Sequence, residues 1–257
     1  MGKIIVVANQ KGGVGKTTTS VNLSAYLGDL KKKTLLIDCD PQGNATSGLG
    51  IEKESLENTV YNVLVENVDI GDTIIETKYK NLSVCPSDVD LAGAEIELVS
   101  VNKREYILKK ALENIKKEYD YIIIDCPPSL GLLTLNAFAC ADSVLIPIQC
   151  EYYALEGLGQ LTNTINSLKK SINNEIEIEG ILLTMFDKRT NLSTLVYEEV
   201  KKFFPEKVFK TVIPRNVRLS EAPSFGEPIL SYDKLSKGAF AYKALAKELI
   251  KNNGKEK

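Results

Sequence analysis

The chain has 257 residues, of which 44% are hydrophobic and 26% are charged, and its net charge is −2. These values are typical of a globular protein with a sizeable core, and they exclude a chain that binds nucleic acid through its overall charge. The sequence contains no histidine, which excludes histidine-based catalytic triads and histidine metal sites, so the chemistry must depend on carboxylates, lysines and a metal ion.

The first predicted element is a short buried strand, Ile4 to Ala8, followed by a glycine turn and a helix that starts at Lys16. A loop of this kind binds anions, because its backbone N–H groups and the positive end of the helix dipole point inward. Lys16 can reach the β- and γ-phosphates of a nucleotide, and the hydroxyl group of Thr17 can ligate Mg²⁺. A tight turn before a helix is the alternative. We predict that a nucleotide contacts Lys11, Gly12, Gly13, Val14, Gly15, Lys16, Thr17 and Thr18.

The second predicted strand begins at Thr34 and ends in two carboxylates, Asp38 and Asp40. Strands of a parallel sheet place functional residues at their carboxyl ends. The loop that follows, residues 41–50, is rich in glycine and small polar residues, which suits a segment that orders around a γ-phosphate. A helix cap is the structural alternative for Asp40.

A third buried strand, Tyr121 to Asp125, also closes on a carboxylate. This is the Walker B pattern, which holds Mg²⁺ directly or through water, and a phosphate loop in the same chain makes the pattern specific. The candidate magnesium ligands are therefore Thr17, Asp40 and Asp125.

The remaining segments alternate between helices and strands, with no repeat or linker. This alternation predicts a doubly wound α/β fold, a mostly parallel sheet flanked by helices, formed by one domain over residues 1–257 with a disordered tail at 252–257. Further predicted elements are a helix within Lys103–Tyr119, strands at Val144–Gln149 and Ile176–Met185, and helices from Glu151, from about Leu192 to Phe203 and from about Lys237 to Lys251.

Several motifs resemble those of one family. An ordinary P-loop has glycine where Gln10 stands, and here a second lysine, Lys11, follows. The run K-G-G-V-G-K-T resembles the deviant Walker A motif of the ParA/MinD ATPases. The segments D-C-D-P-Q-G-N, D-C-P-P-S-L, C-E-Y-Y-A-L-E-G and I-P-R-N-V-R-L-S-E-A-P resemble ParA/Soj chromosome-partitioning ATPases, so that the resemblance covers Lys3 to about Leu249.

This resemblance implies a Mg²⁺-dependent ATPase whose catalytic residues are Lys11, Lys16 and Asp40. Lys11 would reach the partner's phosphates in an ATP-dependent homodimer, Asp40 would orient the attacking water, and Pro214 and Asn216 would contact the edge of the adenine. Lys11 could instead be a solvated charge or bind phosphate in its own subunit, and Pro214 and Asn216 could form a plain turn and helix cap. The family binds double-stranded DNA without sequence preference, acts with a ParB-type centromere-binding protein and is cytoplasmic and nucleoid-associated.

Basic residues are in excess late in the chain. From Lys169 onward 17 basic residues face 12 acidic ones, which indicates either a basic face or an uneven but solvated surface. Arg189 and Arg218 are the leading DNA contacts, because their immediate neighbours leave them free of an adjacent acid; intramolecular ion pairs or nucleotide contacts are the alternative. Other exposed cations of this region are Lys188, Arg215, Lys201, Lys202, Lys234 and Lys237.

Two rival functions use the same loop. A MinD-like ATPase would cycle on a membrane through a basic amphipathic helix, but the end of this chain is short in bulky apolar residues, and neither a signal peptide nor a membrane-spanning run is expected. An iron–sulfur assembly ATPase needs cysteines placed around a cluster. The five cysteines show no C-x-x-C spacing and are expected to be buried, reduced thiols of a cytosolic protein: Cys39, Cys85, Cys126, Cys140 and Cys150.

Overall fold

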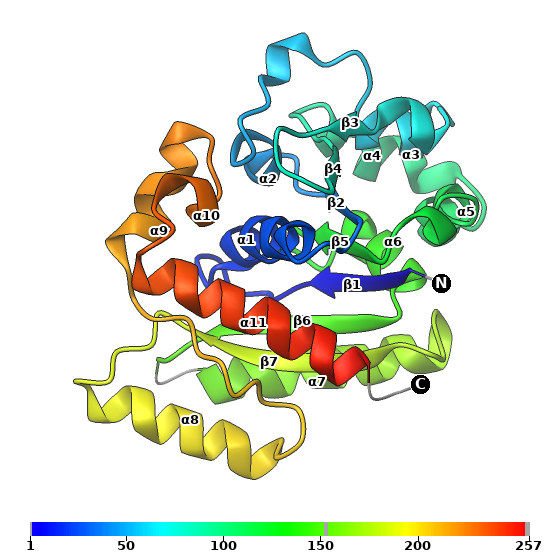
Figure 1. Cartoon of the computed structure of the whole chain (residues 1–257). Helices are drawn as coiled ribbons and strands as arrows, with labels where there is room; N and C mark the ends of the chain where they lie inside the picture. Colours follow the sequence, from blue (N-terminus) through cyan, green and yellow to red (C-terminus); the bar gives the residue numbers. More distant parts are fainter. Residues whose placement is uncertain (1, 152–153, 255–257) are drawn as a thin grey trace.

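The computed structural model describes residues 2–151 and 154–254. A seven-stranded sheet forms the centre of the molecule (Figure 1), with the strand order β3-β4-β2-β5-β1-β6-β7. All neighbouring strands are parallel except β3 and β4. The strands are β1 (Lys3–Val7), β2 (Thr34–Asp38), β3 (Ile75–Glu76), β4 (Leu82–Cys85), β5 (Tyr121–Asp125), β6 (Ser143–Gln149) and β7 (Glu177–Thr184).

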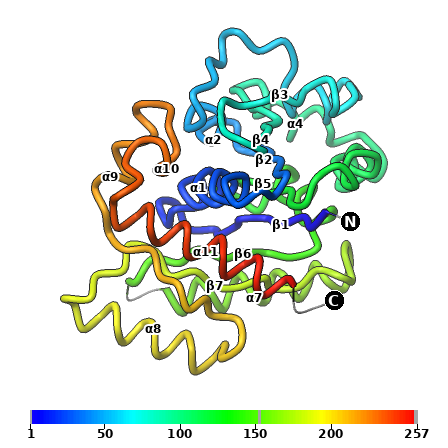
Figure 2. The backbone as a smooth tube through the Cα atoms, in the orientation of Figure 1, coloured from blue at the N-terminus to red at the C-terminus, as the bar shows by residue number. Residues whose placement is uncertain are grey.

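Helices cover both faces of the sheet, which confirms the doubly wound α/β fold predicted from the sequence (Figures 1 and 2). They are α1 (Lys16–Asp29), α2 (Asn44–Ser47), α3 (Val60–Val65), α4 (Leu91–Glu97), α5 (Ile107–Leu112), α6 (Leu132–Cys140), α7 (Ala154–Ser171), α8 (Asn191–Phe203), α9 (Val217–Glu221), α10 (Ile229–Tyr232) and α11 (Lys237–Asn253).

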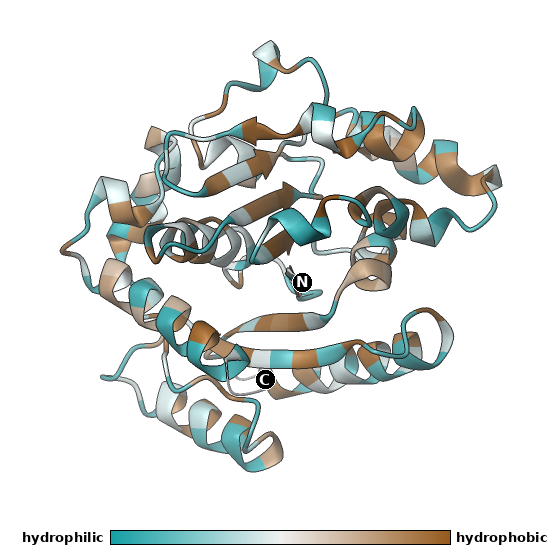
Figure 3. Ribbon diagram, turned by 45° about the vertical axis from the view of Figure 1, so that its right-hand side comes forward, coloured by the Kyte–Doolittle hydropathy of each residue, from teal (hydrophilic) through white to brown (hydrophobic). Residues whose placement is uncertain are grey.

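The central strands are apolar on both sides, because each face of the sheet is buried under helices. In β1, Ile4 and Val6 point into a core shared with α3 to α8, whereas Ile5 and Val7 point into a second core shared with α1, α2 and α9 to α11. Figure 3 shows the result: apolar strands lie between helices whose colours alternate between hydrophobic and hydrophilic. All five cysteines are buried in these cores and free, as predicted.

The helix predicted within Lys103–Tyr119 is not continuous, because α5 spans only Ile107–Leu112. The side chain of Asn136, from α6, accepts a hydrogen bond from the N–H of Leu108 (3.1 Å) and donates one to the carbonyl of Arg104 (2.9 Å). These two backbone groups would bond each other in an uninterrupted α-helix. The buried amide therefore separates the first turn from the rest of the predicted helix.

The end of the chain also differs from the prediction. Helix α11 continues to Asn253, two residues beyond the expected end at Lys251, so the first residues of the predicted tail are helical. The final residues of that tail, 255–257, lie outside the described part of the chain, as do Tyr152 and Tyr153 of the C-E-Y-Y motif. In the part that is described, no helix is long and apolar enough to cross a membrane.

Candidate functional site

The glycine turn between β1 and α1 has the geometry of a phosphate-binding loop. Gly13 and Gly15 have φ values of 73° and 88°, a left-handed region that glycine adopts without strain. A Cβ atom added to Gly12 or Gly13 would have no heavy atom within 4 Å. The loop is thus open on the side where a phosphate would approach its backbone N–H groups and the start of α1.

Lys16 is the first residue of α1, and only 7% of it is exposed. Its Nζ donates a hydrogen bond to the carbonyl of Lys11 (3.1 Å), so the ammonium group lies across the loop. Burial lowers the pKa of Lys16, and the nearby carboxylates Asp125 and Asp40 counter that effect. A cation held in this way is ready to neutralise phosphate oxygens.

Two residues that the sequence reasoning missed hold the loop in place. The side chain of Asn9 donates to the carbonyl of Pro147 (2.7 Å) and accepts from the N–H of Lys11 (3.0 Å). Thr184, at the end of β7, donates to the carbonyls of Val14 (2.8 Å) and Ile148 (3.0 Å). The bond from Asn9 to Lys11 is local, but the bonds to Pro147, Val14 and Ile148 join segments far apart in the sequence, so no local pattern could have revealed them.

Asp125 lies fully buried at the end of β5, next to Val7 of β1. Its carboxylate accepts hydrogen bonds from the hydroxyl groups of Thr17 (2.7 Å) and Ser20 (2.8 Å). Burial first, and then the charge of Asp38, raise the pKa of Asp125 to about 7. Ser20 was also missed, although it stands one helical turn after Thr17 and so shares its face of α1.

These oxygens suit Mg²⁺, which prefers hard oxygen ligands. Thr17 would hold the ion through a lone pair of its hydroxyl oxygen while the same hydroxyl still donates its hydrogen bond to Asp125, because one hydroxyl can donate and accept at once. The ion would neutralise phosphate charge when bound. The third candidate ligand, Asp40, lies on the same edge of the sheet and is 8% exposed.

Asp38 and Asp40 have separate tasks in the loop after β2. Asp38 is fully buried and accepts hydrogen bonds from the N–H of Asp40 (3.2 Å) and from both the N–H and the hydroxyl of Thr46 (2.8 Å each). Burial raises the pKa of Asp38 to about 6. Asp38 therefore fixes the shape of this loop.

Asp40 uses one carboxylate oxygen, Oδ1, to accept from the N–H of Gln42 (3.0 Å). Its Oδ2 accepts no hydrogen bond from a described residue. Asp40 is not the helix cap that we considered as an alternative, because the N-cap of α2 is Gly43. The bond of Asp40 to Gln42 closes a local turn and leaves one oxygen available for a water molecule. The backbone carbonyl of Asp40 accepts from the hydroxyl of Ser87 (2.9 Å), a buried residue just after β4.

Lys11 lies on the rim of the loop, and 48% of its side chain is exposed. Its ammonium group forms an ion pair with Glu151, which follows β6 and is exposed to a similar extent. Lys11 is therefore not simply a solvated charge in this chain. The two lysines of the motif point to different places, since Lys16 lies inside the loop and Lys11 outside it.

A pocket of about 480 Å³ adjoins the loop and contains both residues predicted to contact the base. Pro214 forms one wall, and Asn216 caps α9 by accepting the N–H of Arg218 (2.8 Å) through its Oδ1. The cap leaves the amide N–H groups of Asn216 without an acceptor among the described residues. Other residues that line this pocket are Gly15, Thr18, Thr184, Met185, Ile213, Val217 and Tyr242.

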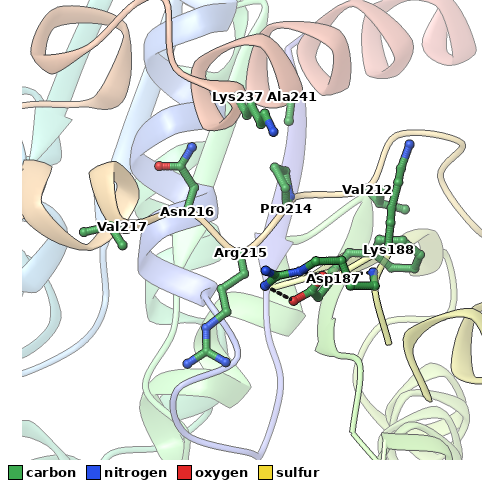
Figure 4. Close-up of a pocket in the computed structure, with 11 residues that line it drawn as sticks. Asp187, Lys188, Val212, Pro214, Arg215, Asn216, Val217, Lys237 and Ala241 are labelled. Carbon is green, nitrogen blue, oxygen red and sulfur yellow. Dashed lines mark hydrogen bonds and ion pairs between the residues drawn. The ribbon is translucent and has the colours of Figure 1, made fainter. Parts of the chain in front are cut away.

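A second pocket, of about 770 Å³, lies beside the first and shares Pro214, Arg215, Asn216 and Val217 with it (Figure 4). It is basic, because Lys188, Arg189, Arg215 and Lys237 line it.

The structure contradicts the reason for choosing Arg189 and Arg218, because both form ion pairs. Arg189 donates to Asp187 from Nε (3.0 Å) and Nη2 (2.7 Å). Arg218 pairs with Glu221 at 2.8 Å and with Asp233 at 3.6 Å. Asp187 and Glu221 stand two and three residues from their arginines in the sequence, where a turn and a short helix bring them into reach, whereas Asp233 stands fifteen residues from Arg218.

Comparison with known proteins identifies the relatives of this chain. A family model described as "AAA domain" matches residues 2–178. The sporulation initiation inhibitor protein Soj of Bacillus subtilis (strain 168) is 63% identical over 252 residues, which cover 98% of this chain and 100% of that protein. The chromosome partitioning protein ParA of Myxococcus xanthus (strain DK1622) is 56% identical over 253 residues, which cover 98% of this chain and 89% of that protein.

A solved structure that is similar to this chain contains a bound nucleotide. The cobyrinic acid a,c-diamide synthase of Mycobacterium smegmatis, solved with an ATP analog and magnesium, superposes with a TM-score of 0.87 at 36% identity. The match covers 100% of this chain and 98% of that one.

Proposed function

Because the chain belongs to the ParA/Soj family of chromosome-partitioning ATPases, we propose that it dimerises on ATP and then binds double-stranded DNA without sequence preference. The protein is an ATPase whose cofactors are ATP and Mg²⁺. A ParB-type centromere-binding protein would stimulate hydrolysis and so release the DNA. We further propose that residues 1–257 act as one ATPase domain, in the cytoplasm and on the nucleoid.

The observation that carries this proposal is the separation of the two lysines. Lys16, 7% exposed, already supplies the cation inside the loop, and one such lysine is sufficient for an ordinary P-loop. Lys11 projects from the rim, with 48% of its side chain exposed. A second subunit that closes over the loop would bring the phosphates of its own nucleotide to Lys11. A dimer therefore gives the additional lysine a role, whereas a monomer does not.

Hydrolysis follows from positioning and charge. Lys16 and the loop N–H groups would hold the phosphates, and Thr17 and Asp125 would hold Mg²⁺. Asp40 would orient a water molecule with its unused Oδ2, in line with the γ-phosphorus. Pro214 and Asn216 would contact the adenine. Pro214 would pack against the base, and the free amide N–H groups of Asn216 would donate hydrogen bonds to its edge. Slow basal turnover is expected until a partner completes the site.

Two observations weigh against the rival functions. The apolar side chains of α11, including Tyr242, Leu245 and Leu249, are buried in the same core as α1, so they are not available for a membrane surface. All five cysteines are buried in the apolar core, so none of them is exposed to bind a cluster between two subunits.

For DNA, the basic pocket of Figure 4 is the surface that we favour. Lys188, Arg215 and Lys237 line it and form no ion pair with any residue that the structure describes. Arg189 also lines the pocket, and Arg189 and Arg218 would contribute by exchanging their carboxylate partners for phosphate, which their exposed guanidinium groups can reach (89% and 55% exposed). One subunit offers few cations, and a dimer doubles them, so ATP would switch DNA binding on through avidity.

The test is the oligomeric state of Lys11→Ala by sedimentation velocity with ATP, ADP and no nucleotide. We expect the variant to bind ATP yet stay monomeric. Glu151→Gln is the matched control, because it breaks the same ion pair but keeps the lysine, and it should dimerise at least as well as the unmodified protein. A normal ATP dimer of Lys11→Ala would return Lys11 to the role of a phosphate contact within its own subunit.

A further inference from the structure

Helix α4 and the residues that flank it carry both buried and exposed apolar side chains. Leu91 and Ala94 of the helix and Leu98 just after it are at most 2% exposed. Ile96 of the helix is 78% exposed, and the flanking residues Val89 and Val99 are 71% and 60% exposed. The outer side of a surface helix is normally polar, and exposed apolar patches mark interaction sites. The outward residues Val89, Ile96 and Val99, with the acidic residues among them, are called the α4 face below.

The α4 face carries only negative charge. Asp88, Asp90 and Glu97 lie within residues 88–102, and that segment contains no lysine or arginine. The fourth acid of the segment, Glu95, is partly buried. None of the four forms an ion pair with another described residue, and Glu97 accepts hydrogen bonds only from the hydroxyl of Tyr61 (3.1 and 3.2 Å). This charge repels DNA phosphates and anionic lipid headgroups, and it attracts a cationic protein segment.

The segment before α4 is bonded to the loop that carries Asp40. Ser87, one residue before the acidic run, is fully buried. Its hydroxyl donates to the carbonyl of Asp40 (2.9 Å), and its N–H donates to the hydroxyl of Thr46 (3.0 Å). Thr46 in turn donates to Asp38. A displacement of α4 would therefore reach Asp40 through one residue.

The middle of α4 touches the segment after Asp125. A Cβ placed on Gly131 would lie 1.9 Å from Oε1 of Glu95, so the glutamate packs directly against that backbone. The same oxygen is buried and has no hydrogen-bond partner among the described residues. The segment from Ser87 to Glu97 thus contacts both the loop after β2 and the segment after β5.

We propose that the α4 face is where the activating partner docks, and that the docking segment of that partner is cationic and amphipathic, with apolar side chains placed between lysines or arginines. The inference rests on the proposed function, because it requires a partner that stimulates hydrolysis. The apolar residues of the segment cover Val89, Ile96 and Val99, and its cations meet the acidic residues. Ser87 is the positioning residue through which docking moves the backbone at Asp40.

The experiment measures ATP turnover against the concentration of the ParB-type protein of the same organism. The variant is Ile96→Ser with Val99→Ser, both exposed positions. Its matched control is Leu192→Ser with Leu195→Ser, a pair of exposed leucines on α8 (42% and 62%), which lies on the opposite side of the molecule (Figures 1 and 2). We expect the α4 variant to need at least tenfold more partner for half-maximal stimulation, with unchanged basal turnover, while the control behaves like the unmodified protein.

A charge variant, Asp90→Asn with Glu97→Gln, tests the same face without changing its apolar residues and serves if the serine variant folds poorly. It should need several-fold more partner, and the difference should shrink at high salt. Overlapping 20-residue peptides of the partner, measured by fluorescence anisotropy, should show one cationic peptide that binds the unmodified protein and not the serine variant.

Ser87→Ala separates docking from transmission. It should leave the partner concentration for half-maximal stimulation unchanged and lower the maximal stimulated rate several-fold. Equal stimulation of the α4 variant and the unmodified protein would overturn the proposal, and so would loss of the ATP-dependent dimer in that variant, since a second copy would then cover the face. If the unmodified protein itself shows no stimulation, the proposed function fails instead.

Discussion

Replacing Asp125 by asparagine should make the nucleotide-free protein more stable at neutral and alkaline pH. Asp125 is fully buried, and its carboxylate is held by two hydroxyl groups rather than by a cation within ion-pair distance. Burial and the neighbouring Asp38 raise its pKa from 3.8 to about 7. One pKa unit corresponds to about 1.4 kcal/mol, so the ionised carboxylate costs the folded state on the order of 4 kcal/mol at pH 8.

The sign of the pH dependence follows from the raised pKa. The carboxyl group of Asp125 has a pKa near 4 in the unfolded chain and about 7 in the folded protein. Its contribution to the free energy of unfolding is therefore fully present below pH 4 and is lost as the pH rises to about 7. Asparagine has the same size and no charge, and the hydroxyls of Thr17 and Ser20 can turn to suit its amide. Asp125→Asn should therefore equal the unmodified protein near pH 4 and exceed its free energy of unfolding by roughly 2–4 kcal/mol at pH 8.

Urea unfolding at pH 4.5, 6 and 8 without nucleotide measures this difference. Asp142→Asn is the control, because Asp142 pairs with Lys116 at 2.8 Å and accepts the N–H of Ile4, and it should be destabilised by about 1 kcal/mol at pH 8. Calorimetry should also show that Asp125→Asn binds ATP with a reduced dependence on Mg²⁺. If Asp125→Asn is less stable than the unmodified protein at pH 8, the carboxylate is stabilising and the argument from burial is wrong.

Three further variants test the other roles. Lys16→Ala should weaken ATP binding at least 100-fold by calorimetry, or about 3 kcal/mol, because the loop loses its charge-assisted hydrogen bonds to phosphate; a wild-type affinity would refute the phosphate-loop assignment. Asp40→Ala should bind ATP, accumulate dimers and lose hydrolysis, and turnover at the normal rate would mean that another group orients the water. Arg189→Glu with Arg218→Glu should abolish DNA binding at moderate salt and keep the ATP dimer. An unchanged salt slope would place the DNA surface elsewhere, for example along Lys201, Lys202 and Lys234.

The sequence predicted those parts of the fold and site that depend on local order. The phosphate loop requires glycines and a lysine at fixed spacing before a helix, and residues 12–16 adopt that geometry. The strands that end in Asp38 and Asp125 are continuous apolar runs closed by a carboxylate, so their ends could be located from the sequence. Parallel pairing of β2 with β5 then places these two aspartates side by side.

The sequence did not predict contacts that depend on how distant segments meet. Glu151 pairs with Lys11 across 140 positions in the sequence. Asn136 interrupts the helix that the hydrophobic periodicity of residues 103–119 predicted. The ion pair of Arg218 with Glu221 could have been predicted from the sequence, because residues three apart on a helix are neighbours. The helix in question, α9, has only five residues, and its hydrophobic pattern is too short to indicate it.

The measurement that tests the central claim most directly is DNA binding by the unmodified protein with ATP, with ADP and without nucleotide, over a series of salt concentrations and on DNA of unrelated sequences. With ATP, we expect the binding constant to be equal for all DNA sequences, and its logarithm to fall steeply and linearly with the logarithm of the salt concentration. With ADP and without nucleotide, we expect much weaker binding. Equal binding in all three nucleotide states, or a preference for one sequence, would contradict the account of an ATP-dependent dimer that holds DNA through its phosphates.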